Sequence, residues 1–165
     1  MLHIVSGCMF AGKTTELVTT YHALKSTKKV LVLDYDTGSK NQLEQFYLST
    51  HDGTFVPCTN VTNLNVDTDY EVLLINEAQF FTGLKEFVLG ELKKKKTVYL
   101  FGLDGDFKQE KFGEIIELLP HADTYVKLYA NCACGSKASF SKRLSADLTQ
   151  YSPHDTYVPV CRACL

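Results

Sequence analysis

The chain has 165 residues, 45% of them hydrophobic and 22% charged, and its formal net charge is -2 at pH 7. This composition is that of an ordinary globular domain, and it excludes collagen, low-complexity disorder and a strongly basic nucleic-acid-binding protein. No basic and apolar leader precedes the first predicted strand, and no apolar stretch approaches the roughly 20 residues of a membrane span. We therefore expect one cytoplasmic protein, in the host cytoplasm if its source is viral, that binds neither nucleic acid nor membrane.

The hydrophobic pattern predicts strands that alternate with helices. A short apolar run at residues 3–5 is followed by a glycine loop and then, over residues 13–25, by apolar residues at helical spacing. A second helix is predicted over residues 84–92. Three continuous apolar runs are typical of strands covered on both faces, at residues 30–33, 72–75 and 97–101. Alternation of this kind predicts a parallel sheet with a ligand site at the carboxyl ends of its strands.

Two stretches depart from this alternation. Residues 37–65 have weak periodicity and many polar side chains, so we expect mostly loop there, with a helix near residues 42–48. After residue 128 the chain changes to short segments with clustered cysteines. We therefore expect residues 1–128 to form the main α/β domain and residues 129–165 to form a small lobe pinned by a metal.

A phosphate-binding loop is predicted between the first strand and the first helix. The pattern G-x-x-x-x-G-K-[ST] is matched by Gly7, Cys8, Met9, Phe10, Ala11, Gly12, Lys13 and Thr14. Glycines allow backbone N–H groups to turn toward phosphate oxygens, and the helix N-terminus adds positive potential. We expect Lys13 to reach the terminal phosphates of a bound nucleotide and the Thr14 hydroxyl to ligate Mg²⁺. The loop alone leaves a kinase, a hydrolytic motor and a molecular switch open.

A kinase also needs a base for the acceptor hydroxyl, which must lie in line with the γ-phosphate. Glu77 is the best candidate, because it lies one position past a buried strand and can point into the same crevice. Phe80 and Phe81 follow it and offer a flat apolar wall. The alternative is that Glu77 is a surface carboxylate at a strand end. Asp104, at the end of the next predicted strand, is a weaker candidate for the base.

Four of the six cysteines form two close pairs in the last quarter of the chain, Cys132 with Cys134 and Cys161 with Cys164. In a reducing compartment, close pairs favour zinc over disulfides. Four thiolates complete a tetrahedral site and leave no open position for catalysis, so we expect a structural Zn²⁺ ion. The alternative is that the pairs are buried free thiols. The polar stretch between the pairs can fold over a ligand as a lid.

Together these motifs resemble the type II thymidine kinases, the family of cytosolic, bacterial and poxviral thymidine kinases. The resemblance covers nearly the whole chain, and the motifs that carry it are, in order, residues 7–17, Thr50-His51-Asp52, residues 77–81, 103–107, 126–128 and 141–144, and Tyr157 ahead of Cys161-Arg162-Ala163-Cys164. It implies a P-loop α/β domain, with a central parallel sheet flanked by helices, and a zinc-binding lobe with a lasso loop. It also implies transfer of the γ-phosphate of ATP, with Mg²⁺, to the 5′-hydroxyl of thymidine by a homotetramer that dTTP inhibits. The compact length suggests a viral member.

The same resemblance implies roles for single residues. Glu77 corresponds to the general base, and the phosphate loop is joined in binding ATP and Mg²⁺ by Asp36, Asn76 and Gln79. The walls of the nucleoside pocket correspond to Met9, Phe80, Leu103, Phe107 and Phe112. Tyr157 closes that pocket, Ser141 and Arg143 support it, and the lasso loop binds the base largely through backbone groups near Leu148, Gln150 and Ser152. The alternative for each pocket aromatic is plain core packing.

The chain departs from the family pattern at three places. Asn76 stands where the family usually has the aspartate that supports Mg²⁺, and an amide is a weaker ligand. Gly38 stands where the family has an arginine, unless Lys40 substitutes for it. Ser152-Pro153 replaces the Gly-Gly of the lasso loop, and proline fixes φ where glycine leaves it free. These departures leave open a second hypothesis, a nucleotide-binding regulator or degenerate nucleoside kinase with little or no turnover.

Overall fold

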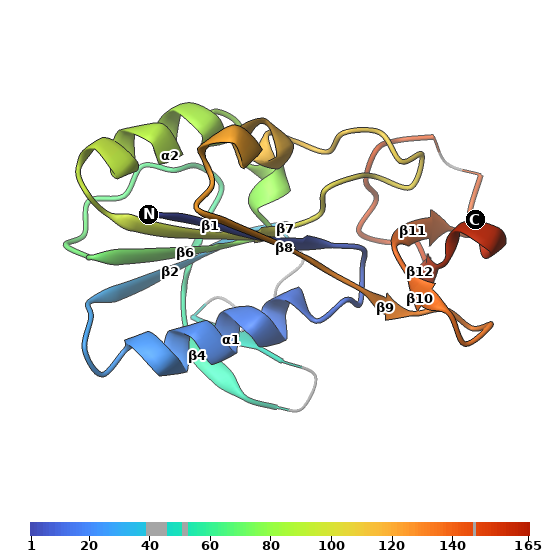
Figure 1. Ribbon diagram of the computed structural model, residues 1–165, viewed down its shortest axis with the longest axis horizontal. Coiled ribbons are helices and arrows are strands. Elements are labelled where there is room, and N and C mark those ends of the chain that lie inside the picture. Colours follow the sequence, from blue (N-terminus) through green and yellow to red (C-terminus); the bar gives the residue numbers. More distant parts are fainter. Residues whose placement is uncertain (39–45, 51–52, 147) are drawn as a thin grey trace.

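Six parallel strands form the centre of the fold. The computed structural model of the chain describes residues 1–38, 46–50, 53–146 and 148–165. The strands lie in the order β5-β2-β6-β7-β1-β8, and every neighbouring pair is parallel (Figure 1). Their bounds are β1 Leu2–Gly7, β2 Val30–Tyr35, β5 Thr59–Val61, β6 Val72–Asn76, β7 Thr97–Gly102 and β8 Thr124–Leu128.

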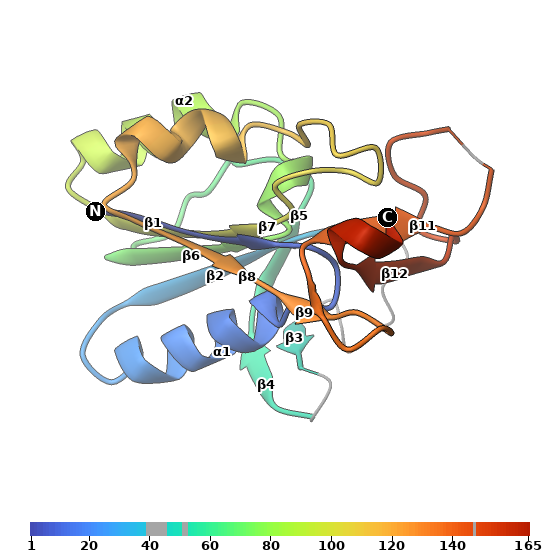
Figure 2. The ribbon, with the colours of Figure 1, turned by 45° about the vertical axis from the view of Figure 1, so that its right-hand side comes forward.

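Helices cover both faces of this sheet. α1 (Lys13–Leu24) lies on one face, and α2 (Leu84–Lys93) lies with the 3-10 helix η2 (Ile115–His121) on the other, as Figures 1 and 2 show. Because side chains alternate along a strand, each buried strand supplies apolar side chains to two cores. In β6, Leu73 packs on the α2 side and Leu74 on the α1 side. No helix within the described residues is long and apolar enough to cross a membrane.

This arrangement confirms the predicted α/β fold with a central parallel sheet flanked by helices. The continuous apolar runs lie in β2, β6 and β7, and the two predicted helices are α1 and α2. Every strand of the sheet ends on the same side of the molecule, because all six are parallel. The polar residues that follow the strands therefore gather at one edge, as the pattern predicts.

The segment expected to be mostly loop holds short strands. β3 (Tyr47–Ser49) and β4 (Phe55–Pro57) form an antiparallel hairpin, and β5 joins the edge of the main sheet. Leu48 and Val56 pair across the hairpin and are buried on the α1 side. The helix expected near residues 42–48 is therefore wrong at residues 46–48, which form a turn and the start of β3. Its residues 42–45 lie outside the described residues, as do Lys40 and the His51-Asp52 part of the family motif.

A small lobe follows the main sheet. β9 (Ala130–Asn131) pairs with β10 (Lys137–Ala138), and β11 (Phe140–Arg143) pairs with β12 (Tyr157–Val160), both antiparallel. The 3-10 helix η3 (Arg162–Cys164) follows β12. We call the described part of residues 129–165 the cysteine lobe. β8 runs directly into β9, so this lobe stands at the carboxyl edge of the main sheet (Figure 2).

We expect Gly113→Ala to destabilise the fold by more than about 2 kcal/mol. Gly113 has a φ of +64°, and a Cβ atom there would lie 2.2 Å from the backbone carbonyl oxygen of Gln79. A backbone oxygen cannot rotate away, so steric overlap adds to the left-handed strain. The matched control is Gly90→Ala inside α2, where a Cβ meets nothing within 4 Å. Alanine should stabilise that helix by up to about 1 kcal/mol. Urea denaturation measures both variants, and equal stabilities would contradict the assignment of overlap at Gly113.

Candidate functional site

The phosphate-binding loop connects β1 to α1 at the carboxyl edge of the sheet. Gly12 caps α1 with a φ of +86°, in the left-handed region that glycine tolerates. The Lys13 ammonium folds back over the loop, where Nζ donates to the Cys8 carbonyl oxygen at 2.8 Å. Burial lowers the pKa of Lys13, while the nearby Glu77 carboxylate acts in the opposite direction. The cation is thus held against the loop that would receive phosphates.

A cavity of about 700 Å³ opens beside this loop. The carboxyl ends of β2 and β6 bound it, and Tyr151 reaches it from the cysteine lobe. The predicted site residues that line the cavity are Met9, Phe10, Ala11, Gly12, Lys13, Thr14, Asn76, Glu77, Gln79, Phe80 and Leu103. The structure therefore brings the phosphate loop, the candidate base and part of the predicted nucleoside pocket to one place.

The other predicted site residues do not line this cavity. Asp36 accepts a hydrogen bond from the Gly38 N–H at 2.9 Å in a tight turn, and its role in binding ATP stays a prediction. The remainder lie around the cavity or in the cysteine lobe: Gly7, Cys8, Phe107, Phe112, Ser141, Arg143, Leu148, Gln150, Ser152 and Tyr157.

Glu77 lies directly after β6 in a strained backbone conformation. Its φ of 50° and ψ of 39° are left-handed, which is uncommon outside glycine, and it starts the 3-10 helix η1 (Ala78–Phe80). Gln79 orients the carboxylate, since its Nε2 donates to Glu77 Oε2 at 2.6 Å while its Oε1 accepts the Leu103 N–H at 3.0 Å. Asp104, the weaker candidate, pairs with Lys127 at 2.5 Å and does not line the cavity. The geometry therefore favours Glu77.

Asn76 is the last residue of β6, Asp34 is the residue before the last in the neighbouring strand β2, and the two side chains bind each other. They are register partners in β6 and β2, each is 4% exposed, and Asn76 Nδ2 donates to Asp34 Oδ1 at 2.8 Å. Both line the cavity, as does Thr14. Carboxylate, amide and hydroxyl oxygens are the ligands that Mg²⁺ prefers in proteins. The donor set at this edge of the cavity therefore fits a Mg²⁺ ion that accompanies a nucleotide.

Aromatic rings form one wall of the cavity. Phe80 stacks on Tyr35 with ring centroids 5.1 Å apart and meets Tyr151 at 4.7 Å. Phe112 packs edge-on against Phe80 at 5.3 Å, and Tyr151 lies parallel to Tyr157 at 6.3 Å. Burial raises the pKa of Tyr151, which keeps its phenol neutral. Flat, apolar faces of this kind suit a planar ring as ligand.

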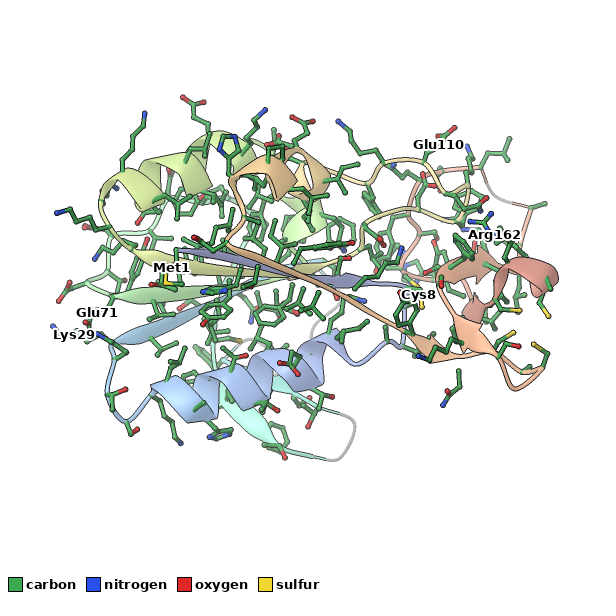
Figure 3. All side chains as sticks on the ribbon, in the orientation of Figure 1. Met1, Cys8, Lys29, Glu71, Glu110 and Arg162 are labelled. Carbon is green, nitrogen blue, oxygen red and sulfur yellow. The ribbon has the colours of Figure 1, made fainter. Side chains whose placement is uncertain are left out.

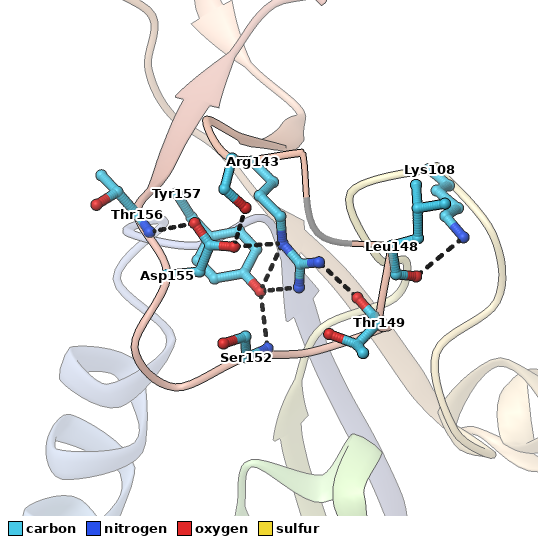
Figure 4. A network of polar contacts seen from close by, with 9 residues as sticks. Lys108, Arg143, Leu148, Thr149, Ser152, Asp155, Thr156 and Tyr157 are labelled. Carbon is cyan, nitrogen blue, oxygen red and sulfur yellow. Dashed lines mark hydrogen bonds and ion pairs between the residues drawn. The ribbon is translucent and has the colours of Figure 1, made fainter.

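Arg143 holds the lasso loop, the segment of residues 144–156 apart from residue 147. Its guanidinium donates to the Thr149 carbonyl oxygen at 2.5 Å and to the Tyr157 hydroxyl, and it pairs with Asp155 at 3.2 Å (Figure 4). The Arg143 side chain is fully buried. A buried cation needs several partners to offset its lost hydration, and these partners lie along the loop. One side chain thus fixes both halves of the lasso loop.

The lasso loop is also tied to the segment that follows β7. Gln150 Nε2 donates to the Asp106 carboxylate at 3.1 Å. Lys108 Nζ donates to the Leu148 carbonyl oxygen at 3.2 Å (Figure 4). The Ser152 N–H donates to the hydroxyl of Tyr157 at 3.1 Å. From the same segment, the ring of Phe107 lies 4.1 Å from the Arg143 guanidinium carbon. The predicted lasso residues therefore contact protein groups around the cavity.

The cysteine lobe packs directly on the phosphate loop. The Met9 N–H donates to Ser141 Oγ at 2.9 Å, and the Cys8 thiol contacts the Ala138 carbonyl oxygen at 3.4 Å. Cys8 is 3% exposed and belongs to the apolar cluster of the lobe, which includes Cys161. Figure 3 labels Cys8 where the main sheet meets the lobe. The lobe therefore supports the loop through both a hydrogen bond and apolar packing.

The four predicted metal ligands come together within the cysteine lobe. The Sγ atoms of Cys132, Cys134, Cys161 and Cys164 all lie within 4.8 Å of one another, and those of Cys134 and Cys161 are 3.6 Å apart. Zn–S bonds of about 2.3 Å place the sulfurs of a tetrahedral site about 3.8 Å apart. Hydrogen bonds from Ser136 lower the pKa of Cys134 to about 6, which favours the thiolate that a metal requires. The cluster can therefore hold zinc.

Sequence reasoning did not assign several residues that line the cavity, among them Asp34, Tyr35 and Tyr151. Asp34 ends the apolar run of β2, and that position was its only signal. Tyr35 follows it and offered no separate signal. Tyr151 lies within the lasso segment, where the family resemblance implies backbone contacts and leaves side chains unassigned. An aromatic residue in that segment is the signal that could have identified it.

We expect Tyr157→Phe to lower the free energy of unfolding by about 1–3 kcal/mol. The lost hydroxyl accepts hydrogen bonds from Arg143 and from the Ser152 N–H, so its removal leaves buried donors without that partner. Chemical denaturation measures the change. Tyr129→Phe removes the hydroxyl of a tyrosine that is 49% exposed and should change stability by less than about 0.5 kcal/mol. Equal effects of the two substitutions would contradict the role given to Tyr157.

Comparison with known proteins agrees with these motifs. A family model described as thymidine kinase matches residues 1–165. The thymidine kinase of Fowlpox virus (strain NVSL) is 35% identical over 174 residues, which are 99% of this chain and 95% of that protein. The thymidine kinase of Yaba monkey tumor virus (strain VR587) is 36% identical over 99% of this chain and 93% of its own length. That of Oryza sativa subsp. japonica is 35% identical over 98% of this chain, which spans 64% of the rice protein.

The family match extends over every motif from which the site was built. It covers the phosphate loop, Glu77 after β6, the lasso loop and the four clustered cysteines. The identities of about one third to poxviral relatives hold along nearly the full length of both chains. The chain therefore belongs to the thymidine kinase family.

Proposed function

We propose that this chain transfers the γ-phosphate of ATP to the 5′-hydroxyl of thymidine and gives dTMP. One observation carries the proposal. In a member of the thymidine kinase family, the phosphate loop and the Glu77 carboxylate face a single cavity that also has an aromatic wall. A phosphate donor and a flat nucleoside can therefore meet beside a candidate base.

The phosphate loop would bind the phosphates of ATP through backbone N–H groups at the N-terminus of α1, with the Lys13 ammonium beside them. Bound Mg²⁺ neutralises charge on the transferred phosphoryl group. Thr14 and Asn76 would hold this ion, because both offer side-chain oxygen at the cavity edge. ATP as donor and Mg²⁺ as cofactor are thus supported by the chemistry of the lining residues.

Glu77 would accept the proton of the 5′-hydroxyl while that oxygen attacks the γ-phosphorus. A new P–O bond then forms to the nucleoside, the bond to the bridging oxygen of ADP breaks, and ADP leaves. Gln79 keeps the carboxylate aimed at the cavity, and the rings of Phe80 and Tyr151 would flank the base.

We propose that the cysteine cluster binds one structural zinc ion. The zinc would fix the turn after β9 against η3 and so hold the lobe that supports the phosphate loop. On this proposal residues 1–128 form the kinase domain and residues 129–165 form the zinc-binding lobe. The division is supported by the change from one large parallel sheet to two small antiparallel ones.

The family resemblance supports three further proposals. The protein would assemble as a homotetramer, be inhibited by dTTP and act in the cytoplasm. Light scattering tests the first, and titration of the kinase assay with dTTP tests the second.

We expect Glu77→Gln to lower kcat for thymidine phosphorylation by about 10²–10⁴-fold, because the amide cannot accept the hydroxyl proton. Binding of ATP should change little, since the phosphate loop is untouched. Transfer of label from ATP to thymidine measures the rate. Glu86→Gln, an exposed carboxylate on α2, is the control and should keep the wild-type rate.

Two outcomes would contradict this proposal in different ways. An unchanged kcat in Glu77→Gln would reject the assignment of the base. Stabilisation by nucleotide in the wild type, without transfer to any nucleoside in a panel, would instead favour the degenerate kinase.

We expect a chelator that removes zinc to lower the melting temperature and to weaken ATP binding, because Cys8 of the phosphate loop packs in the lobe core. Metal analysis should find one zinc ion per chain. Cys161→Ser should lower this content, whereas Cys58→Ser, outside the cluster, should not. Full zinc content in Cys161→Ser would contradict the assigned ligand set.

A further inference from the structure

Asp34 is a buried carboxylate to which the family resemblance gives no role. It lies at the carboxyl end of β2, it is 4% exposed, and it lines the same cavity as Thr14 and Lys13. Burying a carboxylate costs free energy unless hydrogen bonds or a cation compensate its charge. The hydrogen bond from Asn76 is one of the interactions that compensate this charge. The position of the charge beside a phosphate loop points to a cation that arrives with the ligand.

The contact with Asn76 also fixes how the amide is oriented. An ionised carboxylate can only accept hydrogen bonds, so the amide nitrogen of Asn76 must be the atom that faces Asp34. The observed distance of 2.8 Å is between that nitrogen and Asp34 Oδ1. The carbonyl oxygen of Asn76 is then directed away from Asp34. The pair therefore offers one carboxylate and one amide oxygen at the ends of two neighbouring parallel strands.

The two strands place this pair where the family resemblance expects a single aspartate. That aspartate would stand at position 76, which is Asn76 in this chain, and its register partner across β2 and β6 is Asp34. The cavity thus still has one carboxylate at this edge, but the carboxylate lies on β2 instead of the neighbouring strand β6. The phosphate loop lies on the same side, because Thr14 starts α1 at the same edge of the sheet.

We propose that Asp34 supplies the negative charge that attracts and positions the Mg²⁺ of bound ATP, in place of an aspartate at position 76. This inference rests on the proposed kinase function. On this proposal the metal requires a negative charge at this edge of the cavity, and either of the two neighbouring strands can supply it. Asn76, besides offering its oxygen to the ion, positions this carboxylate through its amide nitrogen.

The test compares ATP binding with and without Mg²⁺ by titration calorimetry, so it does not depend on turnover. A carboxylate near the phosphates repels metal-free ATP, and it attracts the Mg²⁺ ion that accompanies the phosphates in the metal complex. We therefore expect Asp34→Asn to weaken Mg²⁺-dependent binding by about 10–100-fold while metal-free ATP binds equally well or more tightly. If Asp34 made only a structural contact, its loss would weaken the binding of metal-free ATP and the binding of ATP with Mg²⁺ to the same extent. Asp69→Asn, an exposed carboxylate paired with Lys29, is the control and should leave both affinities unchanged.

A reciprocal variant, Asp34→Asn with Asn76→Asp, moves the charge to the neighbouring strand and keeps the pair. We expect it to restore the tighter binding of ATP with Mg²⁺, and it serves as the test if Asp34→Asn alone does not fold. The ratio that decides is the affinity for ATP with Mg²⁺ divided by the affinity for metal-free ATP. The inference is overturned if Asp34→Asn folds and keeps the wild-type ratio. It is also overturned if the reciprocal variant folds and does not regain that ratio. If the wild type itself binds no ATP with Mg²⁺, the proposed function fails instead.

Discussion

The parallel sheet with both faces covered is the constraint that decides where the chemistry of this protein lies. Helices on each side require β2 and β6 to be apolar along their length, so polar side chains are admitted only where those strands end. Parallel register then sets Asp34 beside Asn76, with Glu77 one residue further on. The phosphate loop leaves β1 at the same edge, because β1 runs in the same direction. The sheet itself therefore brings the carboxylates of Asp34 and Glu77 and the amide of Asn76 to the phosphate loop.

A single short strand links the phosphate loop to the lasso loop. In β11, Ser141 and Arg143 are both buried, and the period of two along a strand places them on the same face. Ser141 accepts the N–H of Met9 from the phosphate loop, while Arg143 holds the lasso loop through Thr149 and other partners. A displacement of β11 would therefore disturb both contacts at once. The cysteine cluster acts on the same lobe, since Cys161 packs with Cys8 in one apolar cluster.

The features that could be predicted from the sequence are those that local pattern determines. Buried strands, the phosphate loop and the cysteine pairs each have a signature within a few residues. The β3–β4 hairpin does not, because its strands are short and are specified by the pairing of Leu48 with Val56 under α1. Asp34 was visible as the end of an apolar run, but its partner Asn76 is 42 positions away and only the register joins them. Tyr151 depends on long-range contacts of the lasso loop, which no local pattern records.

The absence of Gly-Gly changes what the lasso loop can present to the cavity. The carbonyl oxygens of Leu148 and Thr149 accept hydrogen bonds from Lys108 and Arg143, and the Ser152 N–H is bound to the Tyr157 hydroxyl. Pro153 has no N–H to offer. These backbone groups are therefore occupied by protein partners, and the loop turns the ring of Tyr151 toward Phe80. Stacking tolerates many planar bases, because each has a similar flat face. Selectivity for one base must then arise from the dimensions of the cavity and the polar groups at its edge.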